Sequence, residues 1–133
     1  MIAYKSGYKY QLAKDYRVYI GIHPGKPIET KFISLSNDGY LTIRAGYAWD
    51  GSSWSIDNKK SMPASLVHDA LYQLMRQGLL DLENRNQVDM LYRSMCVDAG
   101  MWEWWASIRY KALVKFGGSA SDPENKKPII IAP

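Results

Sequence analysis

The sequence predicts an α+β fold, in which an N-terminal antiparallel β-sheet is followed by three α-helices packed around a His-Asp centre. Before residue 44, apolar and polar residues alternate in several short runs, which is typical of β-strands. After residue 61, apolar residues recur every three to four positions, which is typical of amphipathic helices. A chain of 133 residues is long enough for one domain with its own hydrophobic core.

The predicted sheet occupies residues 1–44 and has three or four strands. The runs with a strand pattern are residues 2–12, 17–22, 31–35 and 40–44. Asp38-Gly39 lies between the last two runs, and an Asp-Gly pair in this position indicates a β-hairpin. Residues 23–27 contain two prolines and a glycine, which interrupt both helices and sheets, so we expect a loop there.

Three helices are predicted within residues 62–118, after a long connector at 45–61 that is rich in Gly, Ser, Asp and Trp. The expected spans are 62 to about 77, roughly 85–99 and about 102–115. Glycines follow each expected end, at Gly78, Gly100 and Gly117-Gly118, where a left-handed residue commonly ends a helix.

The start signals of the first two helices are also present. Ser61 is a suitable N-cap for the first helix, and Pro63 is tolerated in a first turn. Asn84 with Gln87 three positions later resembles a capping box for the second helix. Residues 119–133 read as a polar C-terminal tail, and its apolar end, Ile129–Ile131, would either add a strand to the sheet or dock into a partner.

Charge and cysteine content restrict the class of protein. The net charge of +4 is small and the basic residues are scattered, which argues against a nucleic-acid-binding protein. The single cysteine, Cys96, cannot form an intramolecular disulfide and is expected to be a buried apolar residue. The sequence has no signal-peptide pattern and no apolar run of the ~20 residues that cross a bilayer. We therefore expect a soluble protein made in a reducing cytoplasm.

The residues with the greatest chemical potential lie on the first two predicted helices. His68 and Tyr72 are one helical turn apart and share a face, whereas Asp69 points about 100° away. Two helices with a short link normally pack antiparallel, which can bring Asp89 opposite His68. A carboxylate on one imidazole nitrogen leaves the other nitrogen free as a general base. The alternative is that Asp89 satisfies a buried His68 and thereby ties the two helices together, with no catalytic role.

The tryptophans suggest a surface contact. Trp104 and Trp105 are adjacent, so one helix cannot bury both against the same neighbour. An exposed tryptophan in this segment is typical of a protein interface or of a membrane surface, and we expect a protein partner before a lipid surface.

Four short motifs carry a resemblance to a known family. They are Trp49-Asp50-Gly51-Ser52-Ser53, His68-Asp69-Ala70-Leu71-Tyr72, Val88-Asp89-Met90-Leu91-Tyr92 and the closing Tyr110–Gly117 segment. In order and spacing they resemble a family of small phage and prophage proteins of unknown function, over roughly residues 30–118. The family usually has a proline shortly after the Asp-Gly-x-Ser segment, where this chain has Trp54. The resemblance implies a phage protein made in the host cytoplasm, but no activity.

A second resemblance implies a mechanism. His-Asp-x-x-Tyr on one helix, followed by Asp-x-x-aromatic on the next, is similar to the catalytic helices of phospholipase A2 enzymes. The resemblance implies that His68 activates a water molecule, that Asp89 orients His68, and that Tyr72 supports Asp89. It also implies that Asp69 binds Ca²⁺, with Asp50 as a second ligand. The chain departs from those enzymes at their glycine-rich calcium loop, because its only counterpart is residues 46–52, with a different motif.

Two functions therefore compete. The first is a small phage hydrolase with a His68–Asp89 dyad and a calcium ion at Asp69 and Asp50, acting on an ester such as a phospholipid. The second is a non-catalytic phage protein, either a virion or tail component or a protein that binds a host protein. In the second case the same residues are a structural pin, and the aromatic surface makes the contacts.

Overall fold

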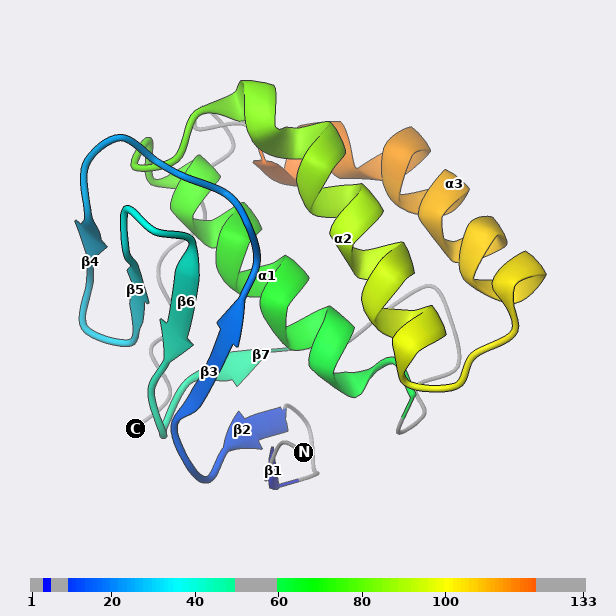
Figure 1. The fold of residues 1–133 in the computed structure, drawn as a ribbon, viewed down its shortest axis with the longest axis horizontal. Helices are drawn as coiled ribbons and strands as arrows, with labels where there is room; N and C mark the ends of the chain where they lie inside the picture. The colour runs from blue at the N-terminus through cyan, green and yellow to red at the C-terminus, as the bar shows by residue number, and fades with distance from the viewer. Residues whose placement is uncertain (1–3, 6–9, 50–59, 122–133) are drawn as a thin grey trace. The chain divides into compact units, whose positions relative to one another are not determined.

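The computed structural model describes residues 4–5, 10–49 and 60–121 (Figure 1). Within these residues the chain forms two compact units, one of strands that ends at Trp49 and one of helices that begins after Lys60. The antiparallel strands and three helices confirm the predicted α+β class. None of the helices in the described ranges is long and apolar enough to cross a membrane.

The larger sheet of the first unit has four antiparallel strands in the order β3-β6-β5-β4. Their bounds are β3 (Tyr16–Tyr19), β4 (Ile28–Glu29), β5 (Ile33–Leu35) and β6 (Tyr40–Ile43). Ile33 pairs with Ile43 and Leu35 with Leu41, and all four side chains are buried. One face of the sheet therefore consists of β-branched and leucine side chains, as the alternation in the sequence predicts.

The predicted hairpin is confirmed between β5 and β6. The Ser36 amide donates to the Tyr40 carbonyl at 3.0 Å, and the Gly39 amide donates to the Ser36 carbonyl at 3.1 Å. Gly39 has φ +91°, and a Cβ there would lie 3.0 Å from the Tyr19 ring and 3.3 Å from the Gly21 backbone. Glycine is therefore required at position 39 both by the left-handed backbone and by the close approach of the segment that contains Tyr19 and Gly21.

A second, three-stranded sheet was not predicted. It pairs β1 (Tyr4–Lys5), β2 (Tyr10–Leu12) and β7 (Ala48–Trp49) in the order β1-β2-β7. The strand β7 lies within the segment that the sequence predicts as a connector. Its two residues show no alternation, and its pairing with Tyr10 and Gln11 depends on a contact that is distant in the sequence.

The second unit contains α1 (Met62–Arg76), α2 (Arg85–Asp98) and α3 (Glu103–Ser121), with a short 3₁₀ helix, η1 (Leu82–Asn84), before α2. The helix α2 packs against both α1 and α3 (Figure 1). Their shared core includes one aromatic side chain among small and aliphatic ones: Ala64, Tyr92, Cys96, Met101, Ala106 and Leu113. The prediction for Cys96 is confirmed, since its side chain is fully buried and burial raises the pKa of its thiol to about 11.

The helix ends test the predicted signals individually. Gly78 has φ +74° and its amide donates to the Met75 carbonyl at 3.0 Å, which confirms it as the residue that ends α1. The Asn84 side chain makes no capping bond, so the predicted capping box is wrong, and η1 precedes α2 instead. The helix α3 continues through Gly117 and Gly118 to Ser121, beyond the expected end near residue 115 and into the segment predicted as a tail.

Candidate functional site

The two helices α1 and α2 enclose a polar centre, which consists of His68, Tyr72 and Asp89. The Nε2 atom of His68 lies 2.8 Å from Oδ1 of Asp89, and the Tyr72 hydroxyl donates to the same oxygen at 2.6 Å. Exposed fractions are 7% for His68, 3% for Tyr72 and 1% for Asp89. Because an ionised carboxylate only accepts hydrogen bonds, Nε2 carries the hydrogen and the neutral ring has its lone pair on Nδ1.

The sequence explains why these side chains meet. His68 and Tyr72 are four residues apart on α1, and their rings stack with centroids 4.0 Å apart. Asp89 lies on α2, which packs along the same helix after a short connection. The structure therefore brings Asp89 opposite His68, as expected, and places Tyr72 as its second donor.

The second imidazole nitrogen of His68 is arranged differently. Its Nδ1 lies 4.0 Å from Oδ1 of Asp69, which is beyond hydrogen-bond distance. The Asp69 side chain is 33% exposed, so this is the more open side of the ring. Among the described residues, Nδ1 has no direct hydrogen-bond partner.

Electrostatics favour a positive charge on this imidazole. Burial by itself lowers the pKa of His68, but the carboxylates of Asp69 and Asp89 together raise this pKa above its ordinary value. Burial and the Asp89 carboxylate raise the pKa of Tyr72 far above its ordinary value, so its hydroxyl remains a donor. The polar centre therefore stabilises an imidazolium and resists formation of a phenolate.

The other oxygen of Asp89 is buried without a hydrogen bond from the described residues, and Asp89 also lines a pocket. No described residue donates a hydrogen bond to Oδ2, and the nearest cation is Arg85, whose Nε lies 3.9 Å away. The guanidinium is held elsewhere, because Nη2 donates to the Val114 carbonyl at 2.7 Å. The pocket has a volume of about 310 Å³, and its lining is Leu82, Glu83, Arg85, Asn86, Asp89 and Val114. It therefore reaches the polar centre through Asp89 and not through His68.

Three residues around the centre were given no role in the sequence reasoning, although Tyr92 belongs to one of the quoted motifs. The first is Arg85, which the i,i+4 spacing to Asp89 would have indicated. The others are Tyr92, whose ring meets the His68 ring edge-on, and Arg109, which is 2% exposed and donates to the Tyr92 hydroxyl at 3.2 Å. No local pattern signals Arg109, whose guanidinium lies 5.6 Å from the centroid of the Trp105 ring.

The predicted metal ligands are only partly described. Asp69 lies beside His68, whereas Asp50 falls outside the described residues. In the ranges that the structure describes, no group of three or more His, Cys, Asp or Glu side chains is arranged to hold a metal ion. The calcium site thus remains a prediction that rests on Asp69 and Asp50.

Comparison with protein-family models, with curated proteins and with solved structures found no match for this chain. The resemblances to the phage family and to phospholipase A2 enzymes therefore remain predictions. The function has to be argued from the polar centre and the surface.

Proposed function

We propose that this protein is a small ester hydrolase in which His68 acts as the general base. One observation carries the proposal: Nε2 of His68 is held by Asp89 at 2.8 Å, while Nδ1 lies 4.0 Å from the partly exposed Asp69 carboxylate. This is the arrangement in which a histidine has a fixed tautomer and a lone pair that no direct hydrogen bond to a described residue occupies. The substrate class suggested by the phospholipase-like pattern is a phospholipid ester.

The chemistry follows from the positions of the two nitrogens. A water molecule next to Nδ1 gives its proton to the imidazole while its oxygen attacks the ester carbonyl carbon. The carbonyl–alkoxy bond then breaks, and the proton on Nδ1 passes to the departing alkoxide. Asp89 stabilises the intermediate imidazolium, and Tyr72 keeps the carboxylate in place. The raised pKa of His68 is consistent with this role, since it reflects stabilisation of the protonated ring.

Calcium is the cofactor proposed for this reaction, with Asp69 and Asp50 as ligands. Calcium in proteins takes six to eight oxygen ligands. The described residues contribute the Asp69 carboxylate alone, which does not make a calcium site, so no step is assigned to the metal. Calorimetry during a titration with Ca²⁺ measures calcium binding separately from the action of His68.

The decisive experiment is an ester-hydrolysis assay with a short-chain phosphatidylcholine, with and without Ca²⁺. We expect His68→Gln to lower turnover by about 10²-fold or more, the usual contribution of a general base. The matched control is His23→Gln, because His23 is exposed and bonds only the Asn37 carbonyl in a loop of the other unit. Equal hydrolysis by the wild type and both variants, in either buffer, would refute the proposal.

A second candidate is a non-catalytic phage protein that binds a phage structural or host protein. It is favoured by the 7% exposure of His68 and by the position of the pocket, whose lining lacks this histidine. Here the polar centre is only a structural pin. The variant Asp89→Asn separates the two candidates by its effect on turnover. Both expect a loss of about 1–3 kcal/mol in the free energy of unfolding, whereas only catalysis expects lost turnover in the protein that remains folded.

A further inference from the structure

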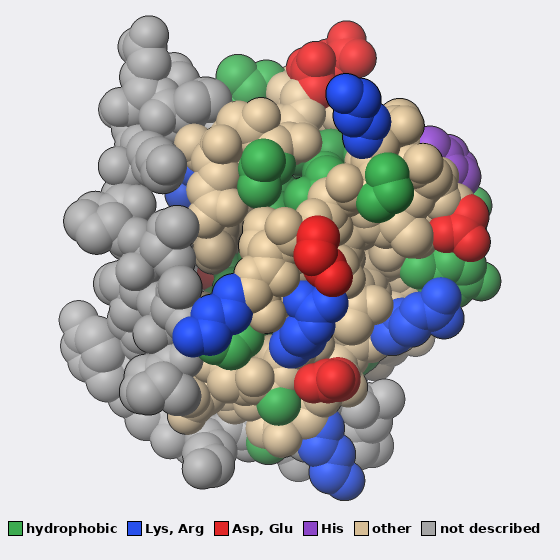
Figure 2. Space-filling view, turned by 90° about the vertical axis from the view of Figure 1, so that its left-hand side faces the viewer, with side chains coloured by type: hydrophobic (Ala, Val, Ile, Leu, Met, Phe, Trp, Pro, Cys, Tyr) green, Lys and Arg blue, Asp and Glu red, His purple; other side chains and the backbone are tan. Residues whose placement is uncertain are grey.

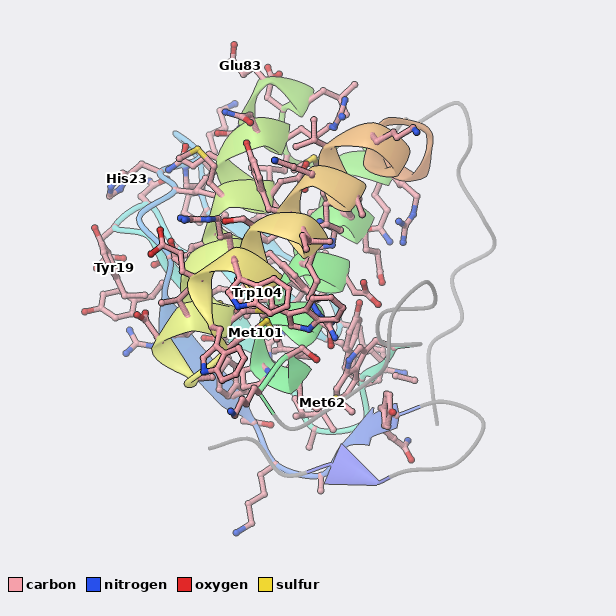
Figure 3. All side chains as sticks on the ribbon, turned by 90° about the vertical axis from the view of Figure 1, so that its right-hand side faces the viewer. Tyr19, His23, Met62, Glu83, Met101 and Trp104 are labelled. Atoms are coloured by element: carbon pink, nitrogen blue, oxygen red, sulfur yellow. The ribbon has the colours of Figure 1, made fainter. Side chains whose placement is uncertain are left out.

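The start of α3 has an unusual surface. Three tryptophans lie there, and their exposed fractions are 71% for Trp102, 58% for Trp104 and 36% for Trp105. Their rings touch one another, with centroids 6.1 Å apart for Trp102–Trp104 and 5.6 Å apart for Trp104–Trp105. Figure 3 shows Trp104 on this helix. Tryptophan is highly buried on average, so a contiguous exposed group of three indicates a contact surface.

The aromatic group continues along α3 as a stripe. The stripe consists of Trp104, Ile108, Lys111 and Lys115, which are spaced i, i+4, i+7 and i+11 and are all exposed. The opposite face of the helix carries the buried Ala106 and Leu113. One surface of α3 is thus apolar at its N-terminal end and basic further along.

No acidic residue interrupts the stripe. Glu103 lies about 100° around the helix axis from Trp104. Its carboxylate is also occupied, because it accepts a hydrogen bond from Arg93 at 2.7 Å. The exposed charges on the stripe itself are therefore its two lysines, while the carboxylate between Trp102 and Trp104 is paired with Arg93. By contrast, the face of the molecule seen in Figure 2 shows basic and acidic side chains interspersed.

We propose that the stripe and the three tryptophans bind the surface of an anionic lipid bilayer, with α3 lying in the plane of the interface. Tryptophan rings partition into the headgroup region, and lysines on the same face are attracted to anionic lipid. The stripe carries two lysines and no carboxylate of its own, and this charge suits an anionic lipid surface. The inference goes beyond the proposed hydrolysis, because binding requires no turnover.

Vesicle partitioning tests the proposal. The full chain is sedimented with vesicles of phosphatidylcholine alone and with vesicles containing 30% phosphatidylglycerol. Each mixture is measured at two salt concentrations, about 0.1 M and about 0.5 M. We expect binding to the anionic vesicles, weakened by high salt, with quenching of tryptophan emission by brominated lipid. Trp104→Ala should weaken partitioning by about tenfold. The double variant Lys111→Gln/Lys115→Gln should weaken it by about 25-fold, since each surface lysine contributes about fivefold.

Matched controls make the result specific. Met90→Ala removes an equally exposed apolar side chain from α2, and Lys26→Gln removes an exposed lysine from the other unit. Both should partition like the wild type. The proposal is overturned if the wild type binds neither kind of vesicle, if it binds both equally, or if the stripe variants bind like the wild type. Failure to bind together with a self-association that Trp104→Ala abolishes would overturn it in favour of a contact between copies.

Failure of the lipid proposal can be distinguished from failure of the proposed hydrolysis. Vesicles of ether-linked lipids cannot be hydrolysed at an ester, so they measure binding alone. On them, His68→Gln should partition like the wild type, whereas Trp104→Ala should not. Hydrolysis of a soluble short-chain ester, in turn, should respond to His68→Gln and not to the stripe variants. A stripe variant that binds ether-lipid vesicles as tightly as the wild type contradicts the surface assignment, whatever the assay of catalysis shows.

Discussion

The helices α1 and α3 depart in opposite directions from the rule that apolar side chains are buried and polar ones exposed. On α1, a histidine is 7% exposed. On α3, the side chain of Trp104 is 58% exposed, and that of Trp102, just before the helix, is 71% exposed. The buried polar group has its partners nearby, since Asp89 accepts from both His68 and Tyr72. The exposed apolar rings contact one another, and Trp105 also lies against the buried Arg109.

The difference shows how each departure is stabilised. Between α1 and α2, the free-energy cost of burying polar atoms is offset by short hydrogen bonds to the Asp89 carboxylate. At the surface of α3, no comparable compensation exists within the ring contacts, because apolar area in contact with water is unfavourable. The centre therefore contributes to folding whether or not it is catalytic, whereas the surface has its clearest explanation in a contact outside the chain. Four substitutions test this contrast.

The largest effect is expected for Asp89→Ala. It removes the acceptor of both His68 and Tyr72 and leaves two buried donors unsatisfied. Breaking a buried charged pair in this way costs about 3–5 kcal/mol. Urea denaturation measures the free energy of unfolding, and Asp98→Ala on the exposed end of the same helix should change it by less than about 0.5 kcal/mol. A similar loss for both variants would mean that the polar centre is not a special contributor to stability.

A smaller loss is expected for Tyr72→Phe. The substitution deletes only the hydroxyl that donates to Asp89 at 2.6 Å. A hydrogen bond to a charged group contributes about 1.5–3 kcal/mol, so we expect a decrease of that size in the free energy of unfolding. Tyr110→Phe is the matched control, because the Tyr110 hydroxyl donates to Asn86 at an exposed site. Equal values for the two tyrosines would contradict the contrast between inside and outside.

The third test is the pH dependence of the His68 contribution. Because the pKa of His68 is raised in the folded protein above its ordinary value of 6.5, the stabilisation from its protonated form is fully present below about pH 6.5. It is lost as the pH rises through the folded-state pKa. The difference in unfolding free energy between the wild type and His68→Gln should therefore shrink as the pH rises above about 6.5.

The control for the pH series is Met90→Ala, which removes no titratable group and should give a difference that does not vary with pH. In the hydrolase, turnover should rise over the same window, since the general base acts in its neutral form. A His68→Gln difference that grows with pH would show that the folded state favours the neutral imidazole instead.

The smallest effect on stability is expected for Trp104→Ala. The side chain is 58% exposed, so its removal should change the free energy of unfolding by less than about 0.5 kcal/mol. Thermal and urea denaturation of the free protein measure this directly. A loss above about 2 kcal/mol would show that the ring is part of the folded core, and would weaken the lipid-surface proposal.

Much of the fold was predictable from local signals. The alternation of Ile33 and Leu35 with polar residues, the Asp38-Gly39 turn and the C-terminal Gly78 each act within a few residues of chain. The signals that failed were equally local. The glycines at 117 and 118 do not end α3, since a glycine at a helix end is a weak preference that a continuing helix can override. The capping box predicted at Asn84 does not form. The 3₁₀ helix η1 precedes α2 instead, and there the Asp81 side chain accepts a hydrogen bond from the Glu83 amide at 2.9 Å.

The candidate site was predictable to the extent that helical spacing fixes neighbours. One helical turn places His68 and Tyr72 on the same face of α1, and a short connection makes α2 an adjacent helix. The sequence could not predict which oxygen of Asp89 accepts the hydrogen bonds. His68 and Tyr72 both donate to Oδ1, and they meet there only once the two helices are packed. The sequence also could not give Arg109, whose burial depends on Tyr92 across α2 and α3.

The sequence by itself determined the α+β class, the polar residues of α1 and α2, and the tryptophans that one helix face cannot bury together. Their periodicities and side-chain sizes are properties of the chain alone. Only the tertiary structure decided the rest: the second sheet through β7, the 310 Å³ pocket beside Asp89, and which face of α3 remains exposed. The physical reason is that each of these depends on which distant segment covers a side chain, and covering is a property of packing rather than of local sequence.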